Sequence, residues 1–215
     1  MLMCLPLRGY FVVNAYLYVD DQSHKGFLLD PGAEYAKVLN LLKEKDIVLE
    51  RILLTHGHFD HTGAAHALHS TLQVPIAMAQ EGRRYAEDPL WNLSLACGEE
   101  VILPEVEYFK SADHPEFVAG NLHLKVRAVP GHTPDSVLYY DEEASLAFVG
   151  DTIFRGSPGS TQFYGGNARD LAKSIVREIA TLPEETVLLS GHSEPTTVRE
   201  EKQQAYFKNL LHHWN

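Results

Sequence analysis

The chain has 215 residues, of which 45% are hydrophobic and 22% are charged, as in an ordinary globular protein. This length predicts one domain that spans residues 1–215. The formal net charge of −11 argues against a nucleic-acid-binding surface.

The predicted elements mix strands and helices along the first half of the chain. Alternating or continuous apolar runs indicate strands, whereas apolar positions three and four apart indicate helices. The predicted strands are 11–19, 27–29, a buried run at 52–55 and 74–79; the predicted helices are 34–45 and one that starts at Thr62 and continues to residue 72. A turn is expected at residues 30–32, where the sequence reads Asp-Pro-Gly.

The second half continues this mixture without repeats or a low-complexity linker. Residues 101–116 are acidic and interrupted by prolines, so their pattern predicts no element. The predicted strands are 122–129, 136–140 and 145–149; the predicted helices are 169–181 and a closing helix at 200–213.

No segment predicts export or attachment to a membrane. No apolar run approaches the ~18 residues that a spanning helix needs. Residues 1–10 have their only charge at Arg8, so they lack the basic start of a signal peptide. Two cysteines, Cys4 and Cys97, are too few for a disulfide framework. We therefore expect a cytoplasmic protein without a membrane partner.

Four side chains that can bind metal lie within six residues, directly after the apolar run 52–55. They are His56, His58, Asp60 and His61. Alternate side chains of an extended segment point the same way, so His56 and His58 can converge on one ion. Asp60 and His61 would face a second ion where the chain turns into the next helix. The competing interpretation is a solvated loop with chance histidines, since the chain has 12 of them.

Three later strand ends repeat one simple pattern, a glycine followed by a single residue that can bind metal. These pairs are Gly131-His132, Gly150-Asp151 and Gly191-His192. Glycine lets a backbone leave a strand sharply and approach an ion closely. One such pair is more often a plain turn, but three of them together with the first segment predict a metal site.

The ordered motifs THGHFDH, GHT, GDT and GH, within residues 55–192, resemble those of the metallo-β-lactamase superfamily. Within that superfamily the chain is most similar to thioester hydrolases of the glyoxalase II type. The resemblance implies an α/β fold, a four-layer αββα sandwich of two mixed β-sheets flanked by helices. True β-lactamases usually carry another residue where His61 stands, which argues against that activity.

The same resemblance implies a centre with two divalent metal ions. Zinc is the first expectation, with iron or manganese as alternatives. One ion would be held by His56, His58 and His132, the other by Asp60, His61 and His192, and Asp151 would bridge both. Asp60 and Asp151 are the expected catalytic carboxylates, and Asp30 is a candidate partner for a ligand imidazole.

Two segments resemble parts of glyoxalase II enzymes that border the substrate. Residues 88–94 contain Trp91, and residues 162–166 contain Tyr164; both side chains are candidate substrate contacts. Core packing is the alternative for Trp91, and a mobile loop the alternative for Tyr164. Gln162 stands where the family has a lysine that binds glutathione, so the thiol carrier is left open.

The expected reaction is hydrolysis of a small-molecule thioester or ester by a hydroxide held between the two ions. A zinc ion lowers the pKa of its water to about 7, which makes hydroxide available at neutral pH. The alternatives are an iron-dependent persulfide dioxygenase, a lactone or phosphodiester hydrolase, and a non-catalytic metal-binding module. The sequence leaves the oligomeric state open.

Overall fold

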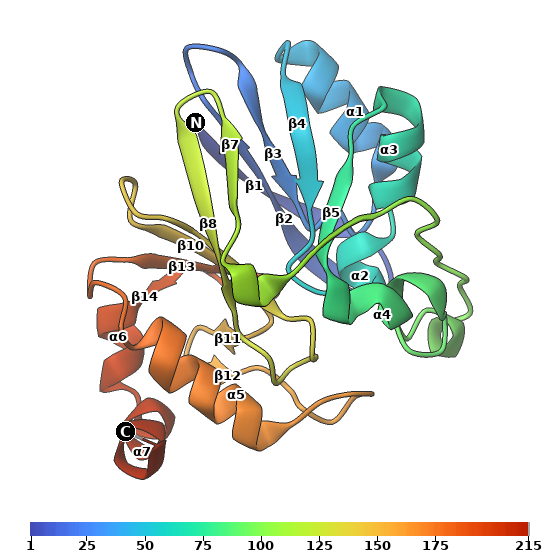
Figure 1. Cartoon of the computed structure of the whole chain (residues 1–215). Helices are drawn as coiled ribbons and strands as arrows, with labels where there is room; N and C mark the ends of the chain where they lie inside the picture. Colours follow the sequence, from blue (N-terminus) through green and yellow to red (C-terminus); the bar gives the residue numbers. More distant parts are fainter. Residues whose placement is uncertain (215) are drawn as a thin grey trace.

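The computed structural model describes residues 1–214 and places two six-stranded sheets against each other (Figure 1). The first sheet contains, in spatial order, β1 (Leu2–Arg8), β2 (Val12–Val19), β3 (Lys25–Leu29), β4 (Val48–Leu53), β5 (Ile76–Ala79) and β6 (Glu107–Phe109). β1, β2 and β3 pair antiparallel, and β3 to β6 pair parallel. The sheet is therefore mixed.

The second sheet is mixed as well. In spatial order it contains β14 (Thr196–Thr197), β13 (Val187–Ser190), β10 (Leu146–Gly150), β9 (Val137–Asp141), β8 (Leu122–Ala128) and β7 (Glu116–Ala119). β10 and β13 are parallel, and the other pairs are antiparallel. A separate small hairpin joins β11 (Ile153–Phe154) to β12 (Ser157–Pro158).

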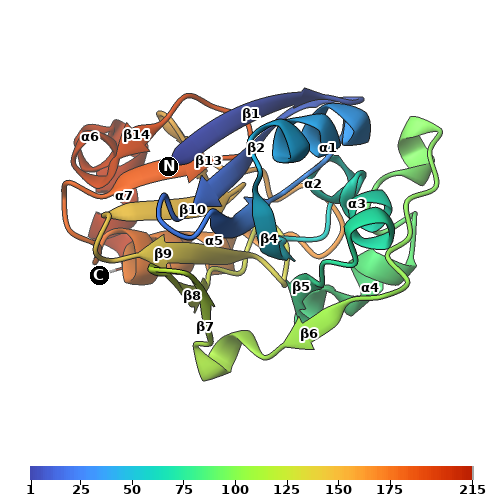
Figure 2. The same ribbon diagram turned by 90° about the horizontal axis from the view of Figure 1, so that it is seen from above.

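Helices cover the outer face of each sheet (Figure 2). On the first sheet lie α1 (Tyr35–Glu44), α2 (Phe59–Thr62), α3 (Ala65–Leu72) and α4 (Arg83–Glu87). On the second lie α5 (Ala168–Ser174), which continues as a π-helical turn (Ile175–Ile179), α6 (Val198–Gln203) and α7 (Ala205–Trp214). Within residues 1–214, no helix is both long and apolar enough to cross a bilayer.

Three hydrophobic cores separate these four layers. Strand β3 shows how the sequence divides between them, because successive side chains of a strand point to opposite faces. Leu28 packs in the core shared with α1 and α3, whereas Phe27 and Leu29 pack in the core between the two sheets. The third core includes Leu171 of α5 and Phe207 of α7. Three cores between four layers confirm the predicted αββα sandwich.

Two predicted helix boundaries were wrong. The helix expected from Thr62 to residue 72 is two helices: α2 begins at Phe59, because His58 is extended (φ −65°, ψ 143°) and the chain turns directly after it, and α3 begins at Ala65. The closing helix expected at 200–213 is two helices, since Gln204 is extended (φ −70°, ψ 146°). This break lets the Phe207 side chain enter the third core. The strand β1 at the N-terminus had not been predicted.

Candidate metal centre

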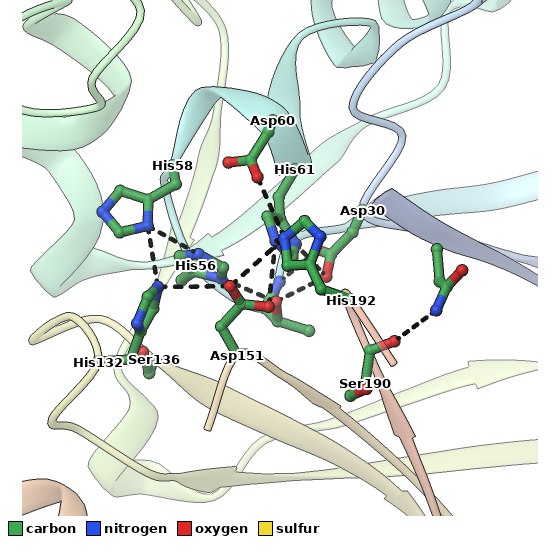
Figure 3. Close-up of polar contacts among 12 residues, drawn as sticks. Asp30, His56, His58, Asp60, His61, His132, Ser136, Asp151, Ser190 and His192 are labelled. Atoms are coloured by element: carbon green, nitrogen blue, oxygen red, sulfur yellow. Dashed lines mark hydrogen bonds and ion pairs between the residues drawn. The ribbon is translucent and has the colours of Figure 1, made fainter. Parts of the chain in front are cut away.

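The structure brings all seven predicted metal-binding side chains to one edge of the two sheets (Figure 3). They come from the segment after β4 (His56, His58), from α2 (Asp60, His61), and from the segments that follow β8, β10 and β13 (His132, Asp151, His192). The strands of both sheets end at this edge, so ligands that are far apart in the sequence become neighbours.

Glycines make this close approach possible. Gly150 has a φ of +51°, which side-chain-bearing residues rarely adopt, and a Cβ there would clash with the side chain of Thr55. A Cβ at Gly191 would lie 2.5 Å from both the His61 ring and an Asp151 oxygen. The glycines before Asp151 and His192 therefore leave the space that the cluster occupies.

The first group consists of His56, His58 and His132, which are all buried. Nε2 of His56 lies 3.1 Å from Nδ1 of His58, and Nε2 of His132 lies 2.9 Å from the same atom. Three imidazole nitrogens therefore face a common point, as predicted for one ion.

The second group consists of Asp60, His61 and His192. Nε2 of His192 lies 3.3 Å from Nε2 of His61 and 3.1 Å from Oδ2 of Asp60. The Asp151 carboxylate lies between the two groups, with its oxygens 3.4 Å from Nε2 of His61 and 3.7 Å from Nε2 of His132. This is the position expected of a bridging ligand.

Hydrogen bonds on the outer side of the rings set which nitrogen carries the proton. Nδ1 of His132 donates to the carbonyl of Ser160 at 2.6 Å, and Nδ1 of His192 donates to the carbonyl of Val12 at 2.8 Å. A carbonyl can only accept, so in the neutral imidazole the inward Nε2 atom of each ring carries a lone pair.

Asp30 organises the other half of the cluster. Its buried carboxylate accepts the N–H of Thr55 at 2.8 Å, the Thr55 hydroxyl at 2.7 Å and Nδ1–H of His61 at 3.0 Å. The oxygen of the same Thr55 hydroxyl lies 3.1 Å from Nδ1 of His56 and accepts a hydrogen bond from its N–H. Asp30 therefore fixes both imidazoles, and the structure confirms it as the partner of a cluster histidine.

This arrangement fits metal ions. Inward lone pairs only 2.9 to 3.3 Å apart repel one another unless a cation lies between them. Protons do not fill that role in the first group, because burial lowers the pKa of His58 to about 3 and that of His56 far below its usual value. The donor set of imidazole nitrogens and carboxylate oxygens suits two ions such as zinc, manganese or iron.

The two carboxylates of the cluster stay ionised. Burial alone would raise the pKa of Asp151, but the neighbouring His61, His192 and His132 outweigh burial and lower it. The pKa of Asp60 is lowered in the same way, against its own burial, by His61 and His192. Both groups thus offer negative oxygens to a cation.

A cleft of about 280 Å³ opens onto the cluster. Cluster residues and Ser160 form its floor, and its walls are apolar: Phe11, Phe59, Leu93, Phe154 and Phe163. The sequence analysis did not identify these walls. Their residues come from three separate loops, the short strand β11 and the short helix α2, and no periodic pattern distinguishes a phenylalanine that lines a cleft from one that packs in a core.

The two predicted substrate contacts lie at the rim and do not line this cleft. Trp91 stacks on Tyr164, with ring centroids 5.7 Å apart, and the guanidinium of Arg84 lies 3.7 Å from the centre of the Trp91 ring. The Tyr164 backbone carbonyl accepts the Tyr85 hydroxyl at 2.5 Å. Their sequence neighbours Leu93 and Phe163 reach the cleft instead, and contact of Trp91 or Tyr164 with substrate stays a prediction.

The similarity to known proteins extends over nearly the whole chain. A probable metallo-hydrolase, YqgX of Bacillus subtilis, is 37% identical over 94% of each chain. The hydroxyacylglutathione hydrolase GloC of Haemophilus influenzae is 29% identical over 93% of this chain and 94% of its own.

Solved structures agree with this similarity. The B3 metallo-β-lactamase BLEG-1 superposes with a TM-score of 0.90 and 32% identity, over 96% of this chain and 99% of its own. The di-iron-bound form of TTHA1623 superposes with a TM-score of 0.84 and 31% identity, over 95% of this chain and 99% of its own. The model of the metallo-β-lactamase superfamily matches residues 8–192. With this match, which includes all seven residues of the cluster, the chain belongs to the metallo-β-lactamase superfamily.

Proposed function

We propose that the chain is a metal-dependent thioester hydrolase of the glyoxalase II type, which cleaves a small-molecule S-acyl thiol. The observation that carries this proposal is the pair of three-residue groups joined by Asp151 at the floor of an open cleft. Its similarity to the hydroxyacylglutathione hydrolase of Haemophilus influenzae supports thioesters as the substrate class.

Asp151 and Asp60 have different roles in such a reaction. Divalent ions, when bound, supply an acidified water and an electrophile for the carbonyl oxygen. Asp151 is placed to orient the attacking water, because its oxygens face both His61 and His132. Asp60 holds His192 in place through a 3.1 Å contact and lines the cleft itself.

The cleft walls exclude bulk water from the reacting bond. The Phe163 ring meets the His58 ring edge-on at 5.6 Å and lies 6.2 Å from the His132 ring. On the opposite side, Phe154 lies 6.1 Å from the His192 ring. A thioester that enters between these rings loses solvent around its carbonyl, which strengthens the electrostatic interactions there.

Thioester hydrolysis by metal-loaded protein tests the proposal. Metal-free protein is reloaded with zinc, manganese or iron(II), its metal content is measured, and thiol release from S-D-lactoylglutathione and from uncharged thioesters is followed. We expect a kcat/KM in the range of roughly 10⁴–10⁸ M⁻¹s⁻¹ for at least one thioester. Protein with two bound metals per chain that hydrolyses none of them contradicts the proposal.

Hydrolysis of β-lactams is the second candidate. It is favoured by the similarity to the B3 metallo-β-lactamase BLEG-1, with a TM-score of 0.90 and 32% identity, whereas the sequence argument based on His61 opposes it. A chromogenic cephalosporin assayed on the same metal-loaded protein distinguishes the two functions. A kcat/KM for the cephalosporin above that for every thioester would replace thioester hydrolysis with this one.

A further inference from the structure

The walls of the cleft are large apolar side chains, and two of them are exposed to solvent. Phe11, at the turn between β1 and β2, is 50% exposed, and Phe163 is 45% exposed. They line the cleft with Phe59, Leu93 and Phe154. Exposed aromatic side chains gathered around a reactive centre lose unfavourable contact with water when an apolar ligand covers them.

Apart from the metal ions that the cluster would hold, the cleft offers no cation to a charged substrate. Among the residues 1–214 that the structure describes, none of those lining it is lysine or arginine. Two arginines near its walls are engaged elsewhere or lie outside the cleft. Arg84 covers the Trp91 ring and lies 3.8 Å from Asp88, and Arg155 follows Phe154 without lining the cleft.

A second cavity, of about 190 Å³, adjoins the cleft and carries negative charge. It shares Phe11, Phe59 and Asp60 with the cleft and adds the carboxylates of Glu34 and Glu99. Glu34 is already paired with a lysine outside the cavity, at 2.9 Å. A substrate that extends past Phe11 and Phe59 therefore meets carboxylates there, and no lysine or arginine is among the described residues that line this cavity.

Glutathione does not suit these surroundings. Its two carboxylates lie several bonds from the sulfur, beyond the cluster, so they would rest against aromatic walls or near acidic side chains. A carboxylate that loses water without gaining a cation or hydrogen bonds is costly. The neutral side chain of Gln162, directly before Phe163, adds no charge to this wall.

We propose that the substrate is an uncharged, apolar acyl thioester and that the cleft discriminates against glutathione thioesters. This inference rests on the proposed thioesterase function. The apolar walls bind the acyl chain or an uncharged thiol. Because no lysine or arginine lines the cleft, carboxylate-bearing thiols are disfavoured. Selection thus depends on the wall residues and not on the cluster beneath them.

Two thioesters that share one acyl group test this selection. The zinc-loaded protein is given S-hexanoyl-N-acetylcysteamine, which is uncharged, and S-hexanoylglutathione, and thiol release is measured for both. We expect kcat/KM to be higher for the uncharged thioester by about tenfold or more. If both thioesters are hydrolysed and kcat/KM for the glutathione thioester is equal or higher, this inference is overturned while the proposed thioesterase function stands. No turnover of either by protein with two bound metals overturns the proposed function itself.

Single lysine substitutions provide the matched test. Phe163→Lys and Phe11→Lys place a cation at the cleft, and both positions are exposed enough to accept the longer polar side chain. Each is expected to shift the preference toward the glutathione thioester by about tenfold, with metal content unchanged. Val118→Lys, at a position 51% exposed on β7, adds the same charge away from the cleft and should leave the preference as it was. Cleft variants that behave like Val118→Lys overturn the inference.

Discussion

Removing the Asp30 carboxylate is expected to weaken metal binding although Asp30 is not one of the seven cluster residues. Asp30 is 3% exposed and accepts three hydrogen bonds, two from Thr55 and one from Nδ1 of His61. Without it, the His61 ring loses the contact that sets its proton position and its orientation. The Thr55 hydroxyl that supports His56 also loses its acceptor.

The size of the effect follows from these contacts. Loss of a partner that orients a metal-binding histidine typically lowers metal affinity about 10- to 100-fold, or ~1.4–2.7 kcal/mol. The buried N–H of Thr55 is left without a partner, which costs the metal-free protein ~1–3 kcal/mol of stability. Asp30 has a φ of +50°, so Asp30→Asn is the milder variant because asparagine tolerates this conformation better than alanine.

The assay is a zinc titration against a chelator, combined with urea unfolding of metal-free and metal-loaded protein. Asp141→Asn is the matched control, because Asp141 is equally buried and accepts hydrogen bonds from Tyr18 and Ala144, outside the cluster. Zinc affinity should fall for Asp30→Asn and stay unchanged for Asp141→Asn. Wild-type zinc affinity in both Asp30→Asn and Asp30→Ala would refute the assigned role of Asp30.

Three further outcomes are expected. Asp151→Ala should lose most turnover, at least about 100-fold in kcat, together with part of its bound metal; near-normal kcat with two metals retained would contradict its bridging position. Phe163→Ala should raise KM for an apolar thioester by about tenfold, and Tyr164→Ala by much less, because only Phe163 lines the cleft. If steady-state kinetics show the larger KM increase for Tyr164→Ala, then Tyr164 and not Phe163 contacts the substrate. Burial raises the pKa of Asp135 to about 7, and its oxygens lie near the Gly57 N–H and the Thr133 hydroxyl without well-formed hydrogen bonds. The folded state therefore holds this proton more tightly, and stability falls as pH rises from about 4 to about 7, by up to ~4 kcal/mol (about three pH units at ~1.4 each). Asp135→Asn should remove that decrease, and an unchanged difference between urea midpoints at pH 5 and pH 8 would contradict it.

The cluster could be predicted from the sequence because each of its parts is local. His56, His58, Asp60 and His61 fall within six residues, and the remaining ligands each follow a glycine at a strand end. Strand ends are visible as short apolar runs, and strands of packed sheets end along shared edges. The pattern therefore predicted the position of the centre, while the division of the seven residues into two groups came from the resemblance to the metallo-β-lactamase superfamily.

What the sequence could not supply depends on distant contacts. Asp30 was a candidate partner for a ligand imidazole, but the sequence did not indicate that His61, 31 positions away, would be the ring that it contacts. The apolar walls also depend on distant contacts, because Phe11 comes from the turn between β1 and β2 and Phe154 from β11, more than 140 positions later. The break at Gln204 contains no proline or glycine, so the helical pattern continued through it.

The positions of these residues separate metal binding from substrate choice. Asp30, Thr55 and backbone carbonyls hold the cluster rings by hydrogen bonds on the side away from the cleft. On the cleft side, the rings of Phe163 and Phe154 meet the histidine rings edge-on. A change at Phe163 can therefore alter which thioester enters without removing a support of the ligands. A change at Asp30 does the opposite and weakens metal binding while the cleft keeps its preference. Ratios between substrates and metal affinity should thus vary independently across the two sets of variants, and a wall variant that lowers zinc affinity as much as Asp30→Asn would show that the two roles are coupled.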